Sequence, residues 1–203
     1  MIQRSLNQIK SETIKAAKGI KLEHGLADDL GNMSAFLASH NINFSNDLCY
    51  LLNKYNNLKY YPNIICKSKK SALVAPFIAK SLIELIISKK IKWEGFVFSP
   101  QFLIASMSLF SKENNIKFSL KNQRNKLIAI SQNSFMHIYT KSLKLDYYIL
   151  SIDNSVENLK SSHLPKNFIN NPIDDKEWKI IISYGKRTFV KDSVLSKEKG
   201  AGY

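Results

Sequence analysis

The change in periodicity along the chain constrains its fold more than any other feature. In the N-terminal third, apolar residues recur at helical spacing, as in Leu26, Leu30, Met33 and Leu37. Between residues 116 and 152 the pattern becomes short runs of β-branched and aromatic residues, IKFSL, KLIAIS, FMHIYT and DYYILSI. Helices followed by a group of strands are typical of α+β proteins. The sequence therefore predicts N-terminal helices packed with a small mixed or antiparallel sheet.

All of these segments are expected to form one domain over residues 1–203. A helical segment spans about 1–58, a mixed α/β segment about 63–152, and a C-terminal helix with an arm about 174–203. The predicted helices span residues 5–20, 25–40, 46–54, 71–89, 100–111 and about 174–185. Ser5, Ser45 and either Asp174 or Asp175 are expected to cap three of them. An edge strand over KIIIS is the alternative to the last helix.

The net charge of +14 raises the question of a nucleic-acid partner. The 30 basic residues include only three arginines, Arg4, Arg124 and Arg187, and the lysines are scattered. Nucleic-acid readers favour arginine, because its planar guanidinium makes paired hydrogen bonds to phosphate and guanine. Lysine, isoleucine and asparagine are abundant together, which is what an AT-rich genome supplies. The sequence therefore favours a dispersed, lysine-rich surface, with nucleic-acid binding as the rival hypothesis.

Two cysteines, Cys49 and Cys66, form neither a CxxC motif nor a disulfide framework. The N-terminal stretch is polar and has no signal-peptide core. The most apolar stretch, residues 71–88, is interrupted by Pro76, Lys80 and Glu84, so it predicts a buried or amphipathic helix and no membrane span. A cytoplasmic protein is expected. No P-loop, zinc or dinucleotide motif is present, so no cofactor and no metal is predicted.

The segment HGLADD, residues 24–29, contains the first candidate site residues. On a helix Asp28 and Asp29 point about 100° apart. Asp29 falls near the apolar stripe, at the rim of a core or cleft, and Asp28 nearly opposite it. His24 and Asp28 share a face, but no third metal ligand lies nearby. The alternative is that both carboxylates only balance the helix dipole in the first turn.

The closing segment KRTFVKDSVLSKEKGAGY contains the second set. Its apolar residues predict an ordered arm that lies back on the domain, with a flexible tail as the alternative. Arg187 is expected to face a carboxylate, Asp28 or Asp29, because an unpaired guanidinium beside apolar groups is costly. Gly200 and Gly202 would let the backbone approach a ligand closely. Ser193 lies between them and Arg187 without a GxSxG motif.

Three segments carry a resemblance to a known family: residues 5–20 with 24–42, LVAPFIA at 73–79, and RTFVKDSVLSKEKGAGY at 187–203. Together they resemble a mainly proteobacterial family of unknown function. The resemblance implies a shared fold and site but no reaction. Asp28, Asp29 and Arg187 match its motif positions, whereas His24 stands in place of a tryptophan and Lys197 in place of an arginine. The family motif continues past Gly-Ala-Gly-Tyr, which predicts that a few residues are missing here.

The predicted function is small-molecule metabolism, as an enzyme or as the accessory subunit of an enzyme, through a polar or anionic ligand. Asp29, with Asp28 beside it, would serve as base or ammonium partner, and Arg187 as carboxylate clamp. Ser193 and the backbone of Gly200 and Gly202 would complete the site. A lysine-driven nucleic-acid binder and a non-catalytic interaction subunit are the alternatives, and a protein partner is left open.

Overall fold

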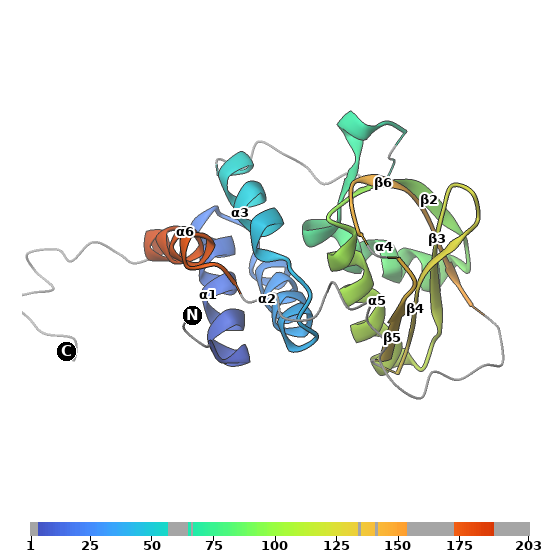
Figure 1. The fold of residues 1–203 in the computed structure, drawn as a ribbon, viewed down its shortest axis with the longest axis horizontal. Coiled ribbons are helices and arrows are strands. Elements are labelled where there is room, and N and C mark those ends of the chain that lie inside the picture. Colours follow the sequence, from blue (N-terminus) through green and yellow to red (C-terminus); the bar gives the residue numbers. More distant parts are fainter. Residues whose placement is uncertain are drawn as a thin grey trace, which may run out of the picture.

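The computed structural model describes residues 4–56, 65, 67–133, 135–140, 142–153 and 173–188. These residues form six α-helices and a six-stranded mixed sheet, an α+β arrangement in one domain, as predicted (Figure 1). No described helix is long and apolar enough to cross a membrane.

Four helices form the helical part of the molecule: α1 (Leu6–Gly19), α2 (His24–Ser39), α3 (Ser45–Lys54) and α6 (Asp175–Gly185). Two of them begin at the predicted caps. The Ser5 hydroxyl accepts a hydrogen bond from the Gln8 amide at 3.1 Å, and an Asp174 carboxylate oxygen accepts one from the Lys176 amide at 3.1 Å. The alternative of an edge strand over KIIIS is therefore wrong. Although α6 comes from the far end of the chain, it packs directly on α1 (Figure 1).

The remaining described elements form the sheet part. They are β1 (Leu73–Val74), α4 (Ala75–Lys89), β2 (Trp93–Phe98), α5 (Pro100–Asn114), β3 (Phe118–Asn122), β4 (Leu127–Gln132), β5 (Phe135–Ile138) and β6 (Asp146–Ile152). The strand order is β1-β2-β6-β3-β4-β5. Only β1 and β2 pair in parallel, and the four other pairs are antiparallel. Short 3₁₀ turns precede β1 at Lys69–Ser71 and follow α6 at Lys186–Thr188.

Both α4 and α5 lie on one face of the sheet, between the sheet and the helical part (Figure 1). Burial alternates along β2, as expected for a strand with one face against these helices: Trp93, Gly95 and Val97 are buried, and Glu94 is exposed. One hydrogen bond joins α5 to the sheet inside the core, between the Ser108 and Ser131 hydroxyls at 2.7 Å. Because α2 packs on α4 and α5 as well, one continuous core runs through both parts.

Three helix boundaries differ from the predictions. The predicted helix 71–89 begins only at Ala75, because Leu73 and Val74 pair with β2 as a strand, and Pro76 then starts the helix. Ser45 does not cap α3; it lies inside the helix, and its hydroxyl donates to Glu177. The helix predicted over 100–111 continues to Asn114.

The predicted core face of the N-terminal helices is confirmed for most of its residues. Leu30, Met33 and Leu37 are buried in α2, and Ile9 and Ile20 are buried opposite them. Leu26 is half-buried. Leu6 was expected in the same core, but its side chain is 45% exposed and lies at the rim of a cleft between α2, α4 and α5.

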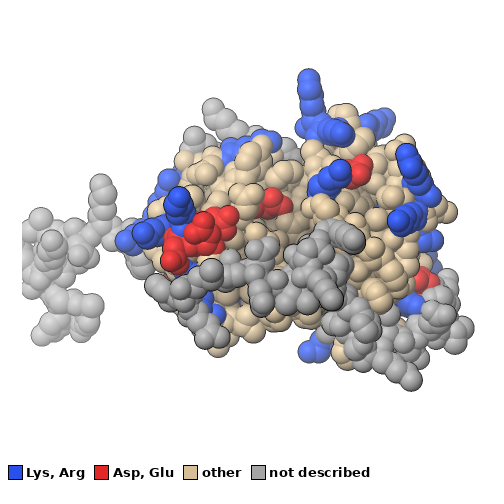
Figure 2. Space-filling model, in the orientation of Figure 1, with Lys and Arg blue, Asp and Glu red and all other residues tan. Residues whose placement is uncertain are grey.

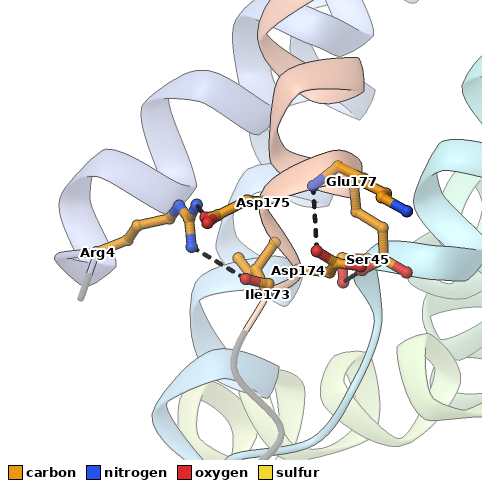
Figure 3. A network of polar contacts seen from close by, with 7 residues as sticks. Arg4, Ser45, Ile173, Asp174, Asp175 and Glu177 are labelled. Carbon is orange, nitrogen blue, oxygen red and sulfur yellow. Dashed lines mark hydrogen bonds and ion pairs between the residues drawn. The ribbon is translucent and has the colours of Figure 1, made fainter. Parts of the chain in front are cut away.

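The start of α6 is tied to α1 and α3 by a polar network (Figure 3). The Arg4 guanidinium donates to the Ile173 carbonyl at 3.0 Å and to the Asp175 carboxylate, and it lies 4.9 Å from the centre of the Trp178 ring. On the other side the Ser45 hydroxyl donates to the Glu177 carboxylate. These contacts join the two ends of the described chain.

A second polar junction joins the helical part to the sheet part. Asp47 of α3 accepts hydrogen bonds from the Ser99 hydroxyl at 2.8 Å and from the Gln101 side-chain amide at 2.5 Å. Both donors lie at the N-terminus of α5 and are buried. Ser99 has a φ of 56°, a left-handed conformation uncommon for serine, at the turn from β2 into α5. The ring of Phe44 meets Phe102 edge-on beside this junction.

Candidate functional site

A cleft lies between α2 on one side and α4 and α5 on the other, with Leu6 of α1 at its rim. Its volume is about 720 Å³. Two stripes of side chains form most of its walls, each at the spacing i, i+3, i+4, i+7 that defines one face of a helix. The stripe from α2 consists of Asp29, Asn32, Met33 and Phe36, and the stripe from α5 of Ser106, Leu109, Phe110 and Glu113.

An ion pair lies in the wall of the cleft. The Lys80 ammonium of α4 donates to the Asp29 carboxylate of α2 at 3.1 Å, and the two side chains are 43% and 21% exposed. The hydrogen bond that Lys80 donates to Asp29 is the main cause that raises the pKa of Lys80 above its ordinary value; burial opposes it, and the charges of Asp29, Glu84 and Glu113 add to it. Lys80 is therefore an ammonium at neutral pH and has no free amine for nucleophilic attack.

Apolar side chains form the other part of the cleft. Phe36, Leu109 and Phe110 are half-buried, so each exposes part of its surface to the cleft, and Met33 is buried behind them. The Phe36 ring packs on the His40 ring with 4.3 Å between their centres. His40 is in turn fixed by a 2.9 Å contact between its Nδ1 atom and the Phe36 carbonyl. The aromatic wall is thus held in place by the last turn of α2.

The predicted difference between the two adjacent aspartates is seen in the structure. Asp29 is half-buried and lines the cleft, whereas Asp28 is exposed and makes no cleft contact. The reason is the 100° step between successive helical residues. Within the described part of the chain, His24 and Asp28 included, no group of three potential metal ligands occurs.

The predicted pairing of Arg187 with Asp28 or Asp29 is wrong. Arg187 follows α6, its guanidinium donates to Asn56 Oδ1, and it lies 4.1 Å from the centre of the Tyr184 ring. The reason is the placement of α6, which packs on α1 and α3, while Asp29 faces α4. Ser193, Gly200 and Gly202 lie outside the described residues, as do all residues of the predicted arm from 189 to 203.

The sequence patterns do not identify most of the cleft residues. They mark Lys80 only as an interruption of an apolar helix, and they do not single out Phe36, Phe110, Lys112 or Glu113. One pattern could have indicated the charged ones among them. A charged residue within a strongly apolar helix is rarely buried unless it has a partner or a functional role. Their meeting in one cleft depends on how the helices pack.

Cys49 and the charges on the face shown in Figure 2 give no further candidate site in the described part of the chain. Burial raises the pKa of the Cys49 thiol to about 12, with a smaller contribution from the Glu177 charge, so this cysteine is unreactive at neutral pH. On the face shown in Figure 2, lysine and arginine side chains are spread over separate elements and do not merge into one groove. This agrees with the predicted dispersal of charge on that face.

Comparison with known proteins gives one match. Residues 4–76 match the model of a family described as a protein of unknown function (DUF3726). The matched stretch contains α1, α2, α3 and the first residues of α4, and so includes Asp29 but neither Lys80 nor α5. The closing Arg-Thr-Phe-Val segment lies beyond it. No curated protein and no solved structure matches the chain.

Proposed function

We propose that the protein binds a small polar organic molecule in the cleft between α2 and α5, as an enzyme of small-molecule metabolism or as the accessory subunit of one. The observation that carries this proposal is the combination of a cleft of about 720 Å³ with an Asp29–Lys80 ion pair in a wall of mixed apolar and polar side chains. Small-molecule sites are typically concave, about 300–1,000 Å³ in volume, and lined by apolar residues with a few polar groups that orient the ligand.

The ion pair suits recognition better than structural support. A partly exposed ion pair contributes only about 0–1 kcal/mol to folding, so stability gives little reason to place two charges in this wall. A bound polar group can exchange hydrogen bonds with either member of the pair. Of the roles predicted for Asp29, that of ammonium partner has support, since it already accepts a hydrogen bond from the Lys80 ammonium.

Arg187, the predicted carboxylate clamp, does not line the cleft. The cations that line it are Lys80 and Lys112. Lysine is a compact point charge without the planar fork of arginine, so it gives weaker directional selection for a carboxylate. The favoured ligand is therefore polar, and an anionic ligand has less support than the sequence suggested.

Ligand-observed and protein-observed NMR with a library of small polar compounds tests this proposal. Compounds that bind are expected to shift the amide resonances of α2, α4 and α5 around the cleft. Asp29→Asn is expected to weaken such binding at least about 5-fold, because it removes the charged partner of Lys80. Asp28→Asn is the matched control, since it makes the same change one residue away on an exposed position and should leave binding unchanged.

Two results would contradict the proposal. One is the absence of any cleft-directed shift across the library. The other is an equal effect of Asp28→Asn and Asp29→Asn on the binding of the best compound. Because neither aspartate is buried in the core, both variants are expected to fold, and their amide spectra would verify this before titration.

A further inference from the structure

We infer that Ser106 determines which ligand the cleft accepts, by exchanging a hydrogen bond with an uncharged polar group of the ligand, a hydroxyl or an amide. This inference rests on the proposed function and assigns to the same cleft a chemical class of ligand and a specificity-determining residue. It follows from the burial of Ser106, from its unpaired hydroxyl, and from the positions of the charges in the lining.

Ser106 is the buried polar residue of the cleft wall. It belongs to the stripe of α5 that faces the cleft, and it is 3% exposed. Among the described residues its hydroxyl makes no hydrogen bond, whereas the Ser108 hydroxyl in the same helix donates to the Ile104 carbonyl at 3.0 Å. Burying a hydroxyl without a partner costs free energy, and a ligand group in the cleft can supply that partner.

The charges of the lining lie at more exposed positions than Ser106. Lys112 and Glu113 are exposed, and the half-buried Asp29 and Lys80 bond to each other. Two carboxylates therefore balance two ammonium groups, so the charge of the lining selects neither a cation nor an anion. A charged ligand group beside the buried Ser106 would lose hydration at a much higher cost than a hydroxyl or an amide would. The buried part of the cleft therefore favours an uncharged polar group.

Asn32 provides a second uncharged polar group, from the α2 wall of the cleft. It is half-buried, and its side-chain amide makes no hydrogen bond among the described residues. A hydroxyl and an amide can each donate and accept, so a ligand group of either kind can pair with Ser106 in both directions. Phe36 and Phe110 present apolar surface for the rest of the molecule, and its burial there contributes binding free energy in proportion to its area.

Two pairs of probes with the same phenylalkyl body test the inference: 3-phenylpropan-1-ol against 3-phenylpropan-1-amine, and 3-phenylpropanamide against 3-phenylpropionate. Each is titrated into the full-length protein at pH 7 and followed by amide shifts and isothermal calorimetry. In each pair the uncharged probe is expected to bind at least about 5-fold more tightly than the charged one. Ser106→Ala should weaken binding of the alcohol and of the amide about 3- to 10-fold. Ser111→Ala is the matched control, because the Ser111 hydroxyl in the same helix is also buried without a partner but does not line the cleft.

The outcomes separate this inference from the proposed function. Equal or tighter binding of the charged probe in either pair overturns the inference but leaves a polar ligand in the cleft. A loss in Ser106→Ala no greater than that in Ser111→Ala also overturns it. Ser106→Cys, which has nearly the same shape but a much weaker donor, repeats the measurement with the packing kept. If none of the probes binds, the inference is overturned, and the compound library described above decides independently whether the cleft binds any polar molecule.

Discussion

At the scale of single residues, glycines determine how closely the N-terminal helices pack. A Cβ atom added at Gly31 of α2 would lie 2.5 Å from Ile14 Cγ1 and 3.0 Å from the Lys10 carbonyl oxygen of α1. A Cβ added at Gly25, in the first turn of the same helix, would meet nothing within 4 Å. Replacing Gly25 by alanine therefore changes helix propensity alone. The same replacement at Gly31 also introduces a steric clash with α1.

Gly31→Ala is expected to destabilise the protein by about 1–3 kcal/mol, because the clash with Ile14 and the α1 backbone exceeds the gain of up to about 1 kcal/mol in helix propensity. Gly25→Ala, the control, should be neutral or stabilising by up to about 1 kcal/mol. Urea denaturation followed by circular dichroism measures both free energies of unfolding. Equal values for the two variants would show that α1 and α2 do not cross at Gly31.

Cys49 provides a second prediction at this scale. Its folded pKa of about 12 lies above the ordinary value of 9.0, and its thiol donates to the Glu177 carbonyl at 3.3 Å. In a Cys66→Ser chain at pH 8, the folded thiol should react with a thiol reagent about 1,000-fold more slowly than in urea, because only the thiolate reacts. As pH rises from 9 toward 12 only the unfolded thiol ionises, so stability should fall there. Rapid labelling of the folded protein would contradict this burial.

At the scale of elements, α6 completes a helical group that the N-terminal helices leave open. A Cβ at Gly19 of α1 would lie 2.0 Å from the Tyr184 carbonyl oxygen of α6, so the two backbones come close together at this glycine. The Tyr184 hydroxyl donates to Asn53 of α3 at 2.7 Å, and Trp178 and Ile181 are buried. The stretch that matches the family model, residues 4–76, ends before α6, although α6 packs against α1, the first helix of that stretch.

Arg4→Ala is expected to destabilise the protein by about 1–3 kcal/mol. The change removes the hydrogen bonds to Ile173 and Asp175 and the stacking on Trp178, all at the start of α6 (Figure 3). Arg124→Ala removes the same charge from an exposed turn after β3 and should stay within about 0.5 kcal/mol of the parent. Hydrogen exchange should rise most in α6. Uniform exchange in both variants would show that Arg4 does not hold this helix.

At the scale of the whole molecule, the helical part and the sheet part meet at several places. Two of them are the cleft, where α2 faces α4 and α5, and the Asp47 junction at the start of α5. The rings of Tyr55 and Phe77 meet edge-on near the start of α4 and add an apolar contact between the two parts. A cleft between two parts changes shape when their junction is weakened.

Asp47→Ala is expected to cost about 2 kcal/mol or more, because it leaves the buried donors of Ser99 and Gln101 without their acceptor. Asp28→Ala, on an exposed face, should cost less than about 0.5 kcal/mol. Thermal unfolding followed by near-ultraviolet circular dichroism compares the two. If Asp47→Ala melted with the control, the junction would contribute nothing to the stability of the domain.

The prediction that residues 186–203 form an ordered arm remains a prediction, because all but three of them lie outside the described residues. Truncation after residue 188 tests it. Loss of stability is expected if Phe189, Val190, Val194 and Leu195 pack on the domain. An unchanged melting temperature would identify the segment as a tail.

The sequence by itself determined the features that depend on neighbours in the chain. Helix and strand patterns, the caps at Ser5 and Asp174, and the orientation of Asp29 relative to Asp28 all follow from periodicity and short-range hydrogen bonds. Such interactions span a few residues, so the local sequence contains both partners. The α+β class follows in turn from the order of these elements.

Only the tertiary structure decided which faces meet. Periodicity shows that a helix has an apolar face but not which element covers it, so Leu6 was placed in the core and Arg187 beside Asp29. The pairing of Asp29 with Lys80, 51 residues away, and of Arg4 with Asp175, 171 residues away, depends on long-range packing. Several arrangements bury similar apolar area, and the specific contacts of Gly31, Asp47 and α6 select among them.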